Sequence, residues 1–165
     1  MKARIMFAVV AIMAAAAVGC TSGDQESGMK NTITQAEAQQ RAESYVREAM
    51  GALSSGPTLE TILSETSPCS DPSDNGPAGR VFASNRYWIR GLPKDQNKQA
   101  VDTLRQWSEQ QGFAVVSDAW DKAKYLTLEN RSNGFRLAIQ ESAQGELSIG
   151  ASSPCVWPNG TPASG

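Results

Sequence analysis

The sequence contains no histidine. Catalysis by a serine–histidine–aspartate triad or a cysteine–histidine pair is therefore excluded, as are the common zinc sites built on imidazole ligands. General acid–base chemistry would depend on aspartate, glutamate, lysine or tyrosine side chains with pKa values shifted by burial. The sequence shows no pair of carboxylates placed for that work. We therefore expect no cofactor and no metal, and an enzyme is the weaker hypothesis.

A basic surface and a long apolar run are also missing. The chain has 15 lysines and arginines against 17 aspartates and glutamates, and without residues 1–19 its net charge is about −4. Nucleic-acid binding needs a basic patch to displace phosphate counterions, so nucleic acid is not an expected partner. The run Ile5–Val18 has 14 residues, whereas a membrane-spanning helix needs about 20.

The N-terminus carries an export signal. Two basic residues precede the run Ile5–Val18, and small residues follow it. This order is typical of a secretory signal peptide over residues 1–19. The next residue is Cys20, and a cysteine at that point is similar to a bacterial lipobox. We predict lipidation of Cys20 and anchoring on the extracytoplasmic side of the cell membrane. Ala17 stands where lipoboxes usually carry leucine, so cleavage without lipidation is the alternative.

Two further cysteines, Cys69 and Cys155, make an even count in an exported protein, where disulfides persist. We predict that they pair. The bond would close a loop of about 87 residues and stabilise the fold by nominally about 4–5 kcal/mol. The alternative is two free thiols, one of them a nucleophile, but no histidine is present to activate it.

The N-terminal half predicts a tether, a helix and a loop. Residues 20–32 are polar and are expected to be a flexible tether. Thr34 and Glu37 have the spacing of a capping box, and a helical apolar stripe follows. This helix is expected to end near residues 54–56. Residues 64–80 are rich in proline, glycine, aspartate and asparagine and are expected to be loop.

The remaining chain predicts a sheet with a second helix. Apolar residues alternate over residues 81–90, with Phe82 and Trp88 on the face opposite the core. A helix is expected over residues 94–111. Shorter strands are expected at 113–116, 125–129, 135–140 and 146–151. The order predicts one α+β domain over residues 33–158, in which two helices pack on one face of an antiparallel β-meander sheet, followed by a disordered tail at 159–165.

Candidate binding residues lie on the sheet and in one loop. Tyr87, Trp88, Trp120 and Trp157 could line a groove, although aromatic residues in small domains usually belong to the core. Trp120 is the strongest candidate for exposure because two aspartates flank it in an expected loop. Trp88 is the second, because Arg86 and Arg90 share its strand face. We therefore consider Trp88, Trp120, Arg86 and Arg90 as ligand-binding candidates.

Several short stretches point to a family. They are Asp71-Pro72 after Cys69, Tyr87–Gly91, Gly112-Phe113 and Ser148–Pro158, which includes Ser-Pro-Cys-Val-Trp-Pro. Together they resemble a group of uncharacterised secreted lipoproteins from streptomycete-like actinobacteria. The resemblance covers roughly residues 34–160. It implies export and a Cys69–Cys155 bond, and it implies no activity.

The leading hypothesis is therefore a membrane-anchored extracytoplasmic lipoprotein domain that binds an envelope protein or a small-molecule ligand. One alternative is an enzyme that uses carboxylate or Tyr/Lys chemistry on cell-wall material. A second alternative is a structural module that binds nothing.

Overall fold

The structure, a computed structural model, describes residues 30–70 and 76–162. The expected signal peptide, Cys20 and most of the expected tether lie outside these residues. Within them, no helix is long and apolar enough to cross a membrane.

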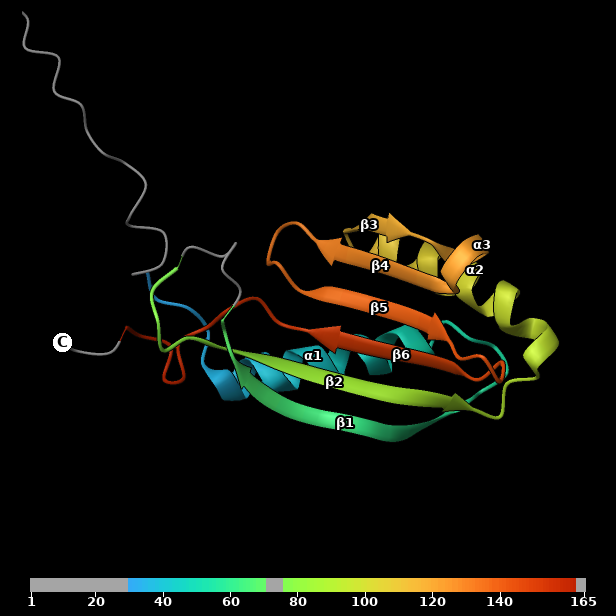
Figure 1. The fold of residues 1–165 in the computed structure, drawn as a ribbon, viewed down its shortest axis with the longest axis horizontal. Helices are drawn as coiled ribbons and strands as arrows, with labels where there is room; N and C mark the ends of the chain where they lie inside the picture. The colour runs from blue at the N-terminus through green and yellow to red at the C-terminus, as the bar shows by residue number, and fades with distance from the viewer. Residues whose placement is uncertain (1–29, 71–75, 163–165) are drawn as a thin grey trace, which may run out of the picture.

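One sheet organises the described chain (Figure 1). The elements in order are α1 (Gln35–Met50), β1 (Thr58–Pro68), β2 (Val81–Arg90), η3 (Lys94–Gln96), α2 (Asn97–Gln110), β3 (Phe113–Asp118), α3 (Trp120–Ala123), β4 (Tyr125–Asn130), β5 (Arg136–Glu141) and β6 (Leu147–Ser152). The 6-stranded sheet has the order β1-β2-β6-β5-β4-β3. All neighbouring strands are antiparallel.

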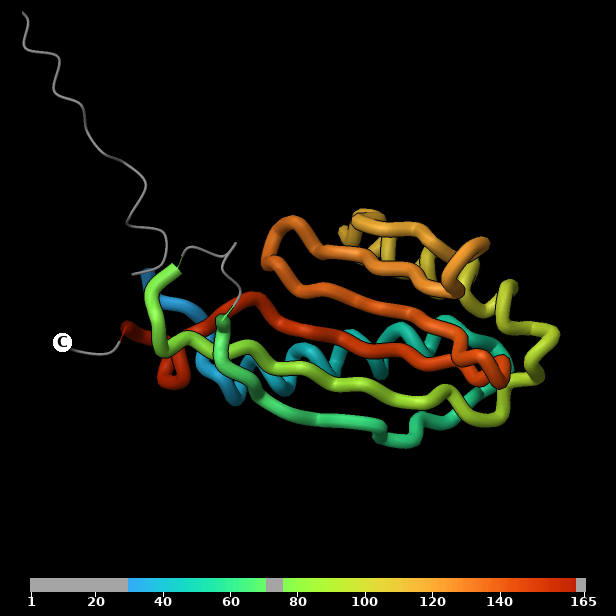
Figure 2. Tube along the Cα trace, viewed as in Figure 1, coloured from blue at the N-terminus to red at the C-terminus, as the bar shows by residue number. Residues whose placement is uncertain are grey.

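The path of the chain explains this strand order. β1 and β2 form a hairpin, and α2 then carries the chain to the far edge of the sheet (Figure 2). From β3 the chain returns as a meander through β4 and β5, and β6 closes against β2. α1 and α2 lie on the same face of the sheet, which confirms the predicted α+β class (Figure 1).

The core fills the space between the two helices and the sheet. α1 presents Ala38, Ala42, Val46 and Ala49, all fully buried, and the small alanines let the helix approach the strands closely. Tyr45 packs edge-on against Phe113, with 5.1 Å between ring centroids. The buried apolar residues of the opposing strands are Ala83, Tyr87, Ile89, Phe113, Leu126, Leu128, Leu137, Ile139, Leu147, Ile149 and Ala151.

α1 begins as predicted and ends earlier than predicted. The Thr34 hydroxyl accepts from the Glu37 backbone N–H, and the Glu37 carboxylate accepts from the Thr34 N–H at 2.7 Å. This capping box is worth about 1 kcal/mol. The helix ends at Met50 instead of residues 54–56, because the chain turns at Gly51. Leu53, after the turn, is still buried.

The sequence pattern does not predict β1. The loop expected over residues 64–80 is wrong for residues 64–68, which belong to β1. Most β1 side chains are exposed on both faces, so no alternation marks the strand. Leu59 packs against the core, and a register shift occurs between Thr61 and Leu63. β1 is an edge strand that exists mainly through its hydrogen bonds to β2.

A disulfide joins Cys69, directly after β1, to Cys155, beyond β6, as predicted. The two Cα atoms are 6.1 Å apart. The bond ties the edge hairpin to the C-terminal segment, which itself pairs with the start of β2 through Val156 and Val81.

The two ends of the described chain lie close together at one end of the sheet (Figure 1) and are hydrogen-bonded to each other. The Thr32 N–H donates to the Gly160 carbonyl at 2.8 Å, and the Trp157 N–H donates to the Thr32 hydroxyl at 2.8 Å. The Trp157 indole N–H donates to the Lys30 carbonyl. Thr32 was expected in the flexible tether and Gly160 in the disordered tail. Both are instead held in the fold by these hydrogen bonds.

Candidate functional site

The face of the sheet that faces away from the helices has a floor of small residues. Side chains alternate along a strand, so Ala83, Asn85, Tyr87 and Ile89 of β2 face the helices and their neighbours face outward. The cross-strand partner of Arg86 is Gly150, whose partner on β5 is Ala138. Other small residues on this face are Ser84, Thr127, Ser148 and Ser152.

Three adjoining hollows run over this floor. A hollow of about 710 Å³ lies near the disulfide and includes Phe82, Arg136 and Ser152. The next, about 310 Å³, shares Arg136 and Ser152 with it and is also lined by Arg86. The last, about 240 Å³, shares Arg86 and is lined by Ile62, Trp88, Gln140, Ser142 and Ser148. We call the three hollows together the sheet trough.

Arg86 reaches across the middle strand of the trough. It stands on β2, and its Nη2 donates to the Gln140 Oε1 on β5 at 3.1 Å, so the side chain passes over β6. The crossing is possible because β6 offers only Ser148 and Gly150 beneath it. Arg86 lines both the middle and the smallest hollow.

Trp88 and Arg90 form a fixed pair at the end of the trough remote from the disulfide. The Arg90 guanidinium lies over the Trp88 ring, 5.3 Å from its centroid. Two carboxylates hold it there: Nε donates to Glu60 at 2.7 Å and Nη1 to Glu146 at 2.6 Å. The hydrogen bond from Arg90 lowers the pKa of Glu60, and the two acids raise the pKa of Arg90.

The arginines of this face differ in how their charges are compensated. Arg90 has two carboxylate partners, and Arg136 has Glu129 at 2.6 Å. Within residues 30–70 and 76–162, no carboxylate lies within ion-pair distance of Arg86, whose only hydrogen-bond partner is the Gln140 amide. Arg86 therefore places a positive charge without an ion-pair partner in the trough, together with N–H donors that no group of the described residues uses.

The predicted exposure of Trp120 is wrong. Only 7% of Trp120 is exposed, and the residue is part of the main core. The sequence suggested a loop, but Trp120 begins the short helix α3, where its N–H donates to the Asp118 carboxylate at 3.1 Å. The flanking aspartate therefore caps the turn that carries the indole inward. Trp157 is also buried, so Trp88 is the tryptophan that lines the trough.

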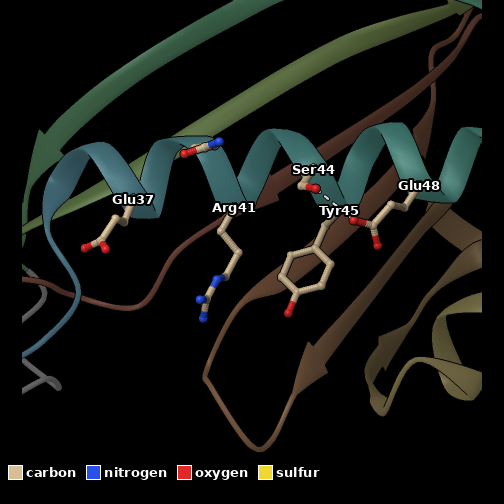
Figure 3. A pocket seen from close by; sticks show the side chains of 6 residues that line it. Glu37, Arg41, Ser44, Tyr45 and Glu48 are labelled. Atoms are coloured by element: carbon tan, nitrogen blue, oxygen red, sulfur yellow. Dashed lines mark hydrogen bonds between the residues drawn. The ribbon is translucent and has the colours of Figure 1, made fainter.

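A separate hollow of about 390 Å³, outside the sheet trough, lies along the outer side of α1 (Figure 3). It is lined by Glu37, Gln40, Arg41, Ser44, Tyr45 and Glu48. Arg41 and Tyr45 point from the helix toward the same side, and the Tyr45 hydroxyl accepts from the Asn133 amide at 2.8 Å. Within the described residues Arg41 has no ion pair either, but it lies over the Phe135 ring, 5.9 Å from its centroid. Glu37 and Glu48 line the same helix hollow, so its lining is acidic overall, in contrast to the lining around Arg86.

The carboxylates beside the sheet trough do not have the environment that a general acid needs. The acids beside the trough, Glu60, Glu129 and Glu146, are each paired with an arginine, and the hydrogen bond from Arg90 lowers the pKa of Glu60. A general acid would need the opposite, a raised pKa. In the part of the chain that the structure describes, no three Cys, Asp or Glu side chains gather as they would around a metal ion.

No protein-family model, no curated protein and no solved structure matches the chain. The geometry of the molecule itself is therefore the basis for assigning a function. The prediction that Trp88, Arg86 and Arg90 share one open face is confirmed. The contributions of Gln140 and Gly150 were missed, because a sequence shows which residues alternate but not which strands become neighbours.

Proposed function

We propose that the protein is a membrane-tethered extracytoplasmic binding module and that the sheet trough is its ligand-binding surface. The observation that carries this proposal is the uncompensated Arg86 charge in a hollow with a partly exposed aromatic wall and a small-residue floor. Ligand sites typically combine a concave surface with a few convergent polar groups. Lipidation at Cys20 would supply the tether, in keeping with the lipobox-like N-terminus.

The position of the termini shows where the tether would join the domain. Lys30 and Thr32 are fixed beside the disulfide, and residues 20–29 would connect them to the lipid. Ten extended residues span at most about 35 Å. The tether would then attach at the disulfide end of the trough, which is remote from Trp88, and would hold the domain within about this distance of the membrane.

Native mass spectrometry of the mature, lipidated protein, gently extracted from its own membrane, tests the binding function. We expect a stoichiometric additional mass on the wild-type chain. The variant Ala138→Leu, which adds bulk to the trough floor, should lose it. The matched control Ala36→Leu adds the same bulk on the exposed side of α1 and should retain it.

The other outcomes decide against the proposal. An additional mass that both variants retain would place the ligand outside the trough. A wild-type chain that carries no additional mass would favour a structural module. Turnover of cell-wall material by the wild type that survives Ala138→Leu would favour an enzyme with a site elsewhere.

A further inference from the structure

We propose that the ligand of the sheet trough is an acidic sugar, a pyranose ring that stacks on Trp88 and carries a carboxylate or phosphate bound by Arg86. This inference rests on the proposed binding function and names the ligand class of the same site. It follows from three features of the smallest hollow: one cation, one aromatic ring and a set of hydroxyl and amide groups.

The positive charge of Arg86 favours a ligand with an anionic group. Arg86 is pre-positioned by its bond to Gln140, and its other guanidinium N–H groups have no partner within the described chain. A guanidinium presents a planar fork that matches the oxygen spacing of a carboxylate or phosphate. Arg90 is less suited to this role, because Glu60 and Glu146 already accept from its Nε and Nη1 and compensate its charge.

The Trp88 ring favours a ligand that has a flat, weakly polar face. Arg90 lies over the Trp88 ring and holds it in place, and the tryptophan lines the hollow together with Arg86. Trp88, Ser148 and Gln140 form one row across β2, β6 and β5, and Arg86 reaches diagonally into that row. The anion site and the ring are therefore neighbours, so one compact ligand can contact both.

The remaining lining groups favour a sugar over an aromatic acid. Gln140, Ser142 and Ser148 bring amide and hydroxyl groups to the hollow, and Ile62 brings the apolar contact. The Ser142 and Ser148 hydroxyls already bond to backbone groups, but the Gln140 Nε2 and the Ser142 hydroxyl hydrogen have no acceptor within the described chain. Ring hydroxyls of a pyranose can accept from these donors, whereas an aromatic ring would cover them without partners. The shared chemistry is thus a ring with hydroxyls and one negative group.

The test is to titrate sugar probes into the full mature protein in detergent. The NMR signal of the Trp88 indole N–H reports binding. Glucuronic acid and glucose 6-phosphate are the carboxylate and phosphate probes, methyl glucoside is the neutral probe, and inorganic phosphate lacks the ring. We expect binding of at least one acidic sugar, and at least about tenfold weaker binding of methyl glucoside and inorganic phosphate. Which acidic probe binds better identifies the anionic group.

Variants of Arg86 distinguish the loss of its charge from a loss of the fold. Arg86→Gln should weaken the acidic sugar about tenfold or more and leave the methyl glucoside affinity unchanged. Arg86→Lys should restore part of the loss, because the charge returns without the fork. Arg47→Gln removes the same charge from α1, where Arg47 pairs with Glu43, and should change nothing. Circular dichroism confirms that each variant is folded.

Any of three results would overturn the proposed ligand class. They are equal binding of neutral and acidic sugars, unchanged affinity of Arg86→Gln for the acidic sugar, and no binding of any acidic probe up to tens of millimolar. The binding function itself would survive this failure if the native additional mass is still lost in Ala138→Leu. If that mass remains in Ala138→Leu, the trough is not the site and both proposals fall.

Discussion

A Cβ atom on Gly150 would lie 2.8 Å from the backbone oxygen of Asn85 on the neighbouring strand. Real Cβ atoms do not come so close to a backbone atom, so β6 can pass β2 at this spacing only with glycine. We expect Gly150→Ala to lower the free energy of unfolding by about 1–3 kcal/mol, because the strands must move apart. Urea unfolding followed by circular dichroism measures this change.

The control for this prediction is Ser152→Ala, on the same strand and the same face. It removes a partly exposed hydroxyl and should change the free energy of unfolding by less than about 0.5 kcal/mol. Equal stability of Gly150→Ala and the wild type would mean that the strands tolerate a side chain here.

Trp120 should behave as a core residue. Its indole is buried in the main cluster, so Trp120→Ala should cost about 3–5 kcal/mol in unfolding free energy. Trp88→Ala should cost less, because Trp88 lies on the open face and is only partly buried. Thermal unfolding of the two variants compares them directly, and a Trp120→Ala protein as stable as the wild type would contradict the packing.

The disulfide should stabilise the fold substantially. Replacing Cys69 and Cys155 together by serine should cost about 2–5 kcal/mol, because the unfolded chain loses a cross-link over 86 residues. Urea unfolding with and without a reductant measures the effect. The reductant should destabilise the wild type and leave the double variant unchanged. A reductant effect of equal size on both proteins would point to a cause other than this bond.

Asp118 should make stability depend on acid pH. The Trp120 backbone N–H and then the Arg105 side chain lower its pKa in the folded protein. A lowered pKa stabilises the fold fully above the unfolded-state value, about 3.9, and this contribution is lost as pH falls through the folded-state value. The stability difference between wild type and Asp118→Asn should therefore be constant from neutral pH down to about 5 and shrink below 4. A difference that grows toward low pH has the wrong sign.

Cys20→Ser tests the proposed lipid anchor. Without the thiol no lipid can attach, so the protein should move from the membrane fraction to the medium, as measured by immunoblotting of the two fractions. Cys69→Ser together with Cys155→Ser is the control, because it removes the other two cysteines without touching the anchor. Retention of Cys20→Ser in the membrane fraction would contradict lipidation at this residue.

Elements with a strong periodic signal could be predicted from the sequence. β2 has the predicted bounds, because Ala83, Tyr87 and Ile89 alternate with outward residues and turn formers follow. The start of α1 at Thr34 was predicted for a similar reason, since a capping box depends on residues only three positions apart.

Features that depend on tertiary neighbours could not be predicted. β1 lacks an apolar face, and only pairing with β2 reveals it. Asn85 interrupts the buried side of β2, yet it is 1% exposed because it hydrogen-bonds with Gln39 and Ser64. The bond between Arg86 and Gln140 likewise requires the strand order, which places β6 between strands that are distant in sequence.

The most direct test of the central claim is a crystal structure of the full mature protein purified from its own membrane with its ligand retained. We expect non-protein density in the sheet trough, within hydrogen-bond distance of the Arg86 guanidinium and against Trp88. Density seated in the helix hollow beside Arg41 and Tyr45, or a trough that holds only water, would contradict it.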